Sequence, residues 1–175
     1  NGAYSVQDFG GYGSDIRGEG VQNTRFTSSG DNSSVIHITG NDGEIRGFSI
    51  TSNHNNVTGL LLDDGNKFTT ASKIRINSCD VGMDLSGCTY SYFNNIIITN
   101  SSDVAIKIGD AASSRWLGDL RFDYVYIPSG RKAVLVGTTS TTVITFDKVT
   151  IEGNFISYDN YGTLTDLHGY CGDGG

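Results

Sequence analysis

Two aspartates occupy equivalent places in two short, similar segments of the chain. The segments read Phe-Asp-Tyr-Val at residues 122–125 and Phe-Asp-Lys-Val at residues 146–149. If these segments are neighbouring strands, the carboxyl groups of Asp123 and Asp147 lie about 5 Å apart. Retaining glycosidases hold their acid and their nucleophile at about this separation. Asp123 and Asp147 are therefore candidate catalytic residues. The alternative is that both are solvated corner residues that point apart.

A polar segment just before this pair supplies further candidates. Residues 113–119 read Ser-Ser-Arg-Trp-Leu-Gly-Asp and contain the only tryptophan of the chain. An exposed indole can stack on a sugar ring, and a neighbouring guanidinium can bind hydroxyl or carboxylate groups. The alternative is that the tryptophan folds back into a small apolar cluster. We expect Asp119 to be a third catalytic candidate. The expected substrate-binding residues are Arg115, Trp116, Tyr124 and Tyr126.

A repeat along the chain predicts the elements that position these residues. Short apolar segments recur in which alternate residues are apolar, as in a strand with one buried face. Their first apolar positions are residues 36, 60, 83, 106, 134 and 156, so the spacings are 24, 23, 23, 28 and 22. The longest spacing contains residues 113–119. We interpret that segment as an outward insertion on a binding face.

A second apolar series lies between the members of the first. Steps of three and then two residues occur five times, as in Ile45-x-x-Phe48-x-Ile50. A plain strand gives only steps of two, so the step of three predicts a bend before the strand. Two short strands per repeat, with no helical segment, predict an all-β fold. Each coil should stack about 4.8 Å from the one before, as in a parallel β-helix.

Stacking should bring like positions of successive coils together, and two expectations follow. After the second strand, Asn53, Asn77 and Asn100 should form a ladder of amide hydrogen bonds at a corner. On the outside of the first strand, Asp84 and Lys107 should form an ion pair between neighbouring coils.

Composition limits the class of protein. The chain has 175 residues, a net charge of −7 and 37% hydrophobic residues. This excludes a disordered chain, and the absence of an apolar run of about 18 residues argues against a membrane-inserted one. The acidic balance argues against a nucleic-acid binder, which needs a basic face. Three cysteines without metal-ligand spacing predict free thiols, and we expect no metal and no cofactor.

Two segments near the N-terminus resemble a known family. YSVQDFGGYGSD (residues 4–15) is similar to the V-x-D-F-G-A-x-G-D opening of pectate-lyase-like right-handed β-helix proteins. IRGEGVQNTRF (residues 16–26) resembles the L-x-G-x-G-x-x-x-T-x-I first coil of those proteins. In the family a long segment separates the two motifs, whereas here they nearly touch. The group contains polysaccharide lyases, hydrolases, epimerases and the tailspikes and tail appendages of bacteriophages.

The resemblance implies a fold and an assembly. It implies a right-handed, single-stranded parallel β-helix of about six coils, of the phage tail-appendage type, which is typically a homotrimer. The outward residues Leu61 and Leu135 would suit a surface covered by another subunit. We expect one domain over residues 1–175, with a first coil or cap at 1–30, regular coils at 31–159 and an irregular tail at 160–175. This domain is expected to be part of a larger protein.

Three functions remain open at this stage. In the first, the chain is a phage tail module, located in the virion, that binds cell-surface polysaccharide. Whether it also hydrolyses that polysaccharide is open at this stage. In the second, it is a structural trimeric stalk without a site. In the third, it is a secreted cellular lyase or epimerase of the pectate-lyase-like group. For that function Arg75 is the candidate base, although no cluster of calcium-binding aspartates surrounds it in the sequence.

Overall fold

The computed structural model describes residues 15–62, 67–109, 119–136 and 143–152, and the backbone of residues 6–9 and 159–160. These residues form strands and turns without a helix. Sheet A consists, in order, of β1 (Val6–Phe9), β4 (Ser34–Ile38), β6 (Thr58–Leu62), β8 (Val81–Asp84), β10 (Ser101–Ile108), β12 (Gly130–Val136) and β14 (Asp159–Asn160).

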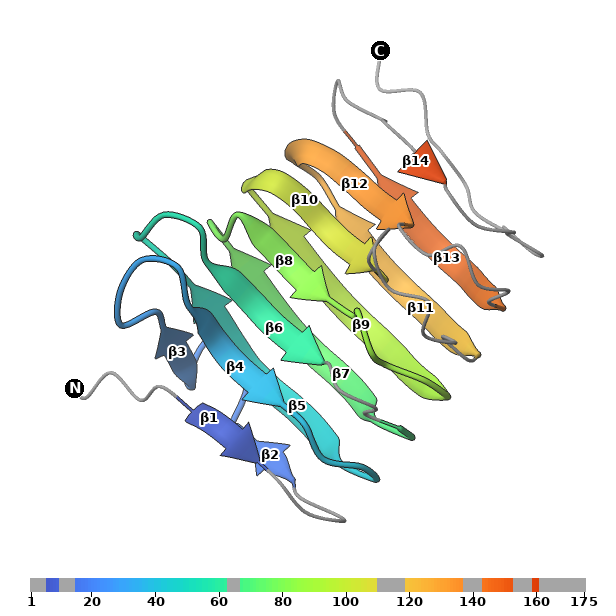
Figure 1. Ribbon diagram of the computed structural model, residues 1–175, viewed down its shortest axis with the longest axis horizontal. Coiled ribbons are helices and arrows are strands. Elements are labelled where there is room, and N and C mark those ends of the chain that lie inside the picture. Colours follow the sequence, from blue (N-terminus) through green and yellow to red (C-terminus); the bar gives the residue numbers. More distant parts are fainter. Residues whose placement is uncertain are drawn as a thin grey trace.

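Sheet B lies behind sheet A in Figure 1. It consists, in order, of β13 (Ile144–Ile151), β11 (Leu120–Ile127), β9 (Ser91–Thr99), β7 (Thr70–Asn77), β5 (Glu44–Thr51) and β2 (Ile16–Arg17), with β3 (Arg25–Thr27) also paired to β5. From β4 to β13 the chain passes from one sheet to the other at every strand, and the strand pairs are parallel.

This architecture is a parallel β-solenoid, which confirms the predicted all-β fold and its coil-on-coil stacking. The apolar positions that define the repeat are neighbours across strands: Leu60 pairs with Met83, and Met83 pairs with Ile106. The expected count of about six coils stays a prediction, because parts of the first and last coils lie outside the described residues. The trimer and the domain limits also stay predictions.

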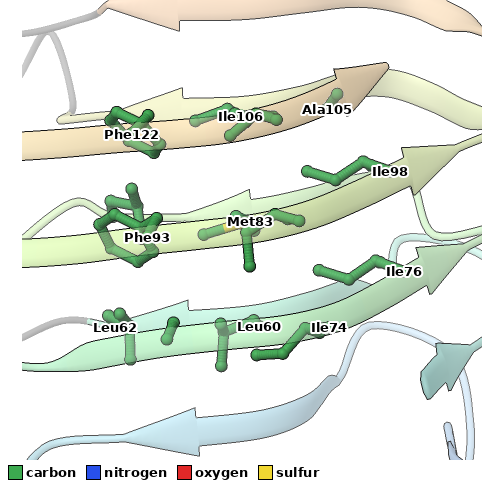
Figure 2. Packing of buried hydrophobic residues seen from close by; sticks show 14 of the residues in the cluster. Leu60, Leu62, Ile74, Ile76, Met83, Phe93, Ile98, Ala105, Ile106 and Phe122 are labelled. Atoms are coloured by element: carbon green, nitrogen blue, oxygen red, sulfur yellow. The ribbon is translucent and has the colours of Figure 1, made fainter. Parts of the chain in front are cut away.

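The core lies between the two sheets and is almost entirely apolar. Figure 2 shows side chains of both sheets pointing into this space, with Phe93 and Phe122 one above the other. The Phe93 and Phe122 rings are stacked at a centroid distance of 4.8 Å, and the Phe122 and Phe146 rings at 4.7 Å. The ring spacing matches the strand spacing of about 4.8 Å, so the aromatic stack reinforces the backbone register.

A left-handed residue explains the step of three in sheet B. In β5, β7, β9, β11 and β13, the second residue after the first apolar position has positive φ: Gly47 (75°), Lys73 (52°), Asn95 (55°), Tyr124 (56°) and Lys148 (53°). Such a residue breaks the alternation of a strand without ending it, and the register is kept because the paired strands carry one at the same position. We call this position the bulge. The bend therefore lies inside each strand, not before it as the sequence predicted.

The outward ion pair of sheet A is confirmed, whereas the amide ladder is largely wrong. Lys107 Nζ lies 3.0 Å from Asp84 Oδ2. Asn77 is in register with Thr51 and Thr99, not with Asn53 or Asn100. One step of the expected ladder survives, because Asn100 Nδ2 donates to Asn77 Oδ1 at 3.0 Å.

The free thiols are confirmed for two of the cysteines. Cys79 and Cys88 are buried and form no disulfide, whereas Cys171 lies outside the described residues. Burial raises the pKa of both thiols to about 12.

Replacing Lys73 by glycine should raise the free energy of unfolding by up to about 1 kcal/mol. Glycine adopts positive φ without the steric cost that an L side chain incurs there. The matched control is Arg75→Gly, two residues along the same strand and outside the positive-φ set, which should lower stability by about 0.5–1 kcal/mol. Urea titration of both variants measures the difference, and an equal loss in the two would contradict the bulge.

Candidate functional site

The candidate acids lie in one column on the outer face of sheet B. Asn94 of β9 pairs with Asp123 of β11, and Asp123 pairs with Asp147 of β13. The backbones of the two aspartates are thus one strand spacing apart, about 4.8 Å. The structure brings Asp123 and Asp147 together as their sequence positions indicated.

Asp123 is held in a small polar cluster. Only 9% of the residue is exposed, and Tyr92 Oη donates to its Oδ2 at 3.1 Å. Asn94 Nδ2 donates in turn to Tyr92 Oη at 2.7 Å. Arg121 lies over the Tyr92 ring, 5.8 Å from its centroid, in a cation–π contact. Tyr92 therefore holds the side chain of Asp123, and Asn94 and Arg121 hold Tyr92.

The second carboxylate oxygen of Asp123 is an unusual feature of this cluster. Asp123 Oδ1 is buried, and no hydrogen-bond partner for it occurs among the described residues. An unpartnered buried acceptor is costly, because burial removes the water that would otherwise donate a hydrogen bond to it.

A cation lies beside the acid pair. Lys148 Nζ donates to Tyr124 Oη at 2.8 Å and lies 4.3 Å from the centre of the Tyr124 ring. The hydrogen bond to Tyr124 raises the pKa of Lys148, and the charges of Asp147 and Asp123 add to this effect. The ammonium group therefore stays positive at neutral pH and partly offsets the two carboxylates.

The other predicted site residues fall in different places. Asp119 is exposed and precedes β11 directly, so its Cα is about 13 Å along the strand from that of Asp123. The structure does not place it with the acid pair. Arg115 and Trp116 lie outside the described residues. Tyr124 is 53% exposed and contacts Lys148.

An open groove of about 570 Å³ runs across the same face, beyond the bulge. One outward residue from each successive strand contributes to it: Arg25, Ser49, Arg75, Ile97 and Tyr126, which are in register from β3 to β11. We call this feature the arginine groove. It follows the solenoid axis, because each step to the next residue is a step to the next strand.

A second row of polar groups forms one side of the arginine groove. Thr51, Asn77 and Thr99 line it and are in register with one another. Thr99 Oγ1 donates to Asn77 Oδ1 at 2.7 Å, which orients the Asn77 amide. Hydroxyl and amide groups therefore recur along the groove at the spacing of the strands.

A detour of the chain borders one end of the groove. Both Arg17 and Arg25 pair with β5, so the residues between them form a loop over the Gly47 bulge. Gly20 N donates to Gly47 O at 2.7 Å, and a Cβ on Gly18 would overlap that same oxygen. The loop therefore needs glycine at this close approach, and it supplies Val21 to the groove wall.

Tyr126 marks the other end of the groove. Its ring is 36% exposed, and its hydroxyl donates to Glu152 Oε2 at 2.7 Å. This hydrogen bond raises the pKa of Tyr126. Tyr126 follows Asp123 by three residues on β11, and the groove lining includes neither Asp123 nor Asp147. The acids therefore border the groove from the far side of the bulge.

Sequence reasoning did not predict that Tyr92 contacts both Arg121 and Asp123. Tyr92 is in register with Arg121, yet its hydroxyl reaches Asp123, two residues further along β11. The columns alone do not reveal such a diagonal contact. Arg25 was also missed, although the extra residues between Arg17 and Arg25 are a signal that a loop leaves the coil there.

Comparisons with other proteins give no assignment. No protein-family model, no curated protein and no solved structure matches the chain. In the residues described, no three His, Cys, Asp or Glu side chains are grouped to hold a metal ion. That same part of the chain has no helix with the length and apolarity for a membrane crossing.

Replacing Tyr92 by phenylalanine should lower the free energy of unfolding by about 1–3 kcal/mol. The change leaves both oxygens of buried Asp123 without a partner, and an unsatisfied buried acceptor costs about this much. Tyr124→Phe is the matched control, because its hydroxyl is at the surface and should matter by less than about 0.5 kcal/mol. Chemical denaturation compares the two, and a Tyr92→Phe variant as stable as the parent would contradict the assigned hydrogen bond.

Proposed function

We propose that this β-solenoid binds polysaccharide along the arginine groove. The observation that carries the proposal is the alignment of Ser49, Arg75, Ile97 and Tyr126 on four successive strands. A linear polymer lying along the axis meets one of these side chains at each strand, about 4.8 Å apart. An open, elongated groove suits a chain that extends beyond its ends.

The chemistry of the lining fits sugars. The exposed Tyr126 ring offers a flat apolar face on which a sugar ring can stack. The hydrogen bond from the Tyr126 hydroxyl to Glu152 fixes the orientation of this ring. Thr51, Asn77 and Thr99 supply hydroxyl and amide groups for sugar hydroxyls. This combination of one aromatic face and several neutral polar groups is typical of carbohydrate recognition.

Hydrolysis is the second candidate function, favoured by the register of Asp123 and Asp147. One carboxyl group would protonate the glycosidic oxygen while the other attacks the anomeric carbon. Water would then release the glycosyl intermediate, with the first residue acting as base. A location in a phage tail and a trimeric assembly remain part of the proposal.

A glycan array followed by a cleavage assay tests both functions. We expect binding to at least one bacterial capsular or wall polysaccharide, reduced about tenfold or more by Tyr126→Ala. Tyr90→Ala, which removes an exposed tyrosine outside the groove lining, is the control and should bind normally. If the polymer is also cut, Asp123→Asn should abolish reducing-end release and keep binding.

The outcomes separate the competing functions. Binding that survives Tyr126→Ala would remove the groove as the site. Cleavage by Asp123→Asn at the parental rate would remove the acid pair as the catalytic residues. A protein that binds no glycan at all would be better explained as a structural stalk.

A further inference from the structure

The arginine groove contains two guanidinium groups without an acidic partner. Arg25 and Arg75 are exposed and lie in the same outward column, on either side of Ser49. Neither forms an ion pair or a hydrogen bond with any other described side chain, and the residues that line the groove include no Asp or Glu. Positive charge is therefore concentrated there without local compensation.

Two other arginines of the same sheet, Arg17 and Arg46, have an acidic partner. Arg17 lies 2.8 Å from Glu44 Oε2, and Arg46 lies 3.2 Å from Glu44 Oε1. The chain as a whole carries 12 basic and 19 acidic residues, so acidic partners are abundant. Glu44 thus neutralises Arg17 and Arg46, and the Tyr92 ring contacts Arg121, whereas Arg25 and Arg75 have no such contact among the described residues.

We infer that the arginine groove selects an anionic polysaccharide whose carboxylate or sulfate groups bridge Arg25 and Arg75. The two residues are separated by two strand steps, from β3 through β5 to β7, which places their backbones about 10 Å apart. A guanidinium binds carboxylate or sulfate oxygens through paired N–H donors. The inference rests on the proposed function and adds the charge of the ligand to it.

A polysaccharide fits these charges better than a nucleic acid does. Nucleic-acid binding needs many phosphate contacts from a basic face, whereas the groove offers two guanidiniums in a chain with a net charge of −7. The net charge also repels an anionic glycan at long range, but at about 0.15 M salt this repulsion decays within about 8 Å. Contacts inside the groove then decide the affinity.

Calorimetric titration with dextran sulfate and with neutral dextran of the same length tests the inference. At 0.15 M salt we expect dextran sulfate to bind at least about tenfold more tightly than dextran. Arg25→Gln and Arg75→Gln should each weaken dextran sulfate binding by about tenfold, because each removes a charged hydrogen-bond donor. Lys73→Gln is the matched control: it removes an exposed cation from the same strand outside the groove lining and should change the affinity less than about twofold.

Each other outcome overturns the inference. Equal affinity for dextran and dextran sulfate would leave a glycan-binding groove without charge selection. An equal loss in Lys73→Gln would show general attraction instead of contact, and tighter binding of a single-stranded oligonucleotide would show a different ligand class. Absence of dextran sulfate binding also overturns it. The proposed function is rejected only if, in addition, no glycan on the array binds. Unfolding curves confirm that the variants are folded.

Discussion

In-register parallel pairing between successive coils is the constraint on which the rest of this structure depends. Each strand of sheet B pairs with the strand one coil earlier, so position along the chain becomes position along the axis. The apolar column that contains Phe93, Phe122 and Phe146 stacks its rings at the same spacing as the strands. Backbone pairing and core packing therefore favour the same register, and a slip would disturb both. The outward columns inherit this register, including the one that holds Asp123 and Asp147.

The left-handed residue inside each strand of sheet B decides what the outer face presents. In a regular strand, neighbouring residues point to opposite faces. At the bulge, Asp123 and Tyr124 both lie toward the outside, as do Asp147 and Lys148, and this places a cation beside the acid pair. The same bulge separates the acids from the arginine groove. One repeated backbone feature thus separates the column that contains Asp123 and Asp147 from the column that contains Arg25 and Arg75.

The parts of the fold that depend on the core were predictable from the sequence. Inward positions must be apolar in every coil, so their spacing revealed the two sheets, the stacking and the register of Asp123 with Asp147. Corners lack this constraint, because a coil can gain or lose a residue there without changing the core. For this reason the ladder expected for Asn53, Asn77 and Asn100 was out of register. The diagonal hydrogen bond from Tyr92 and the loop before Arg25 depend on side-chain reach and local backbone geometry, which spacing does not encode.

The register of the acid pair can be measured directly by disulfide trapping. Cysteines placed at Asp123 and Asp147 would have Cα atoms about 4.8 Å apart, which a disulfide spans. Cysteines at Asp123 and Thr145 would be displaced by two residues, about 8 Å apart, beyond the usual limit of about 7 Å. After mild oxidation and peptide mapping by mass spectrometry, we predict a cross-link in the first pair and none in the second. A cross-link formed only by the second pair, or equally by both, would contradict the register on which the site is built.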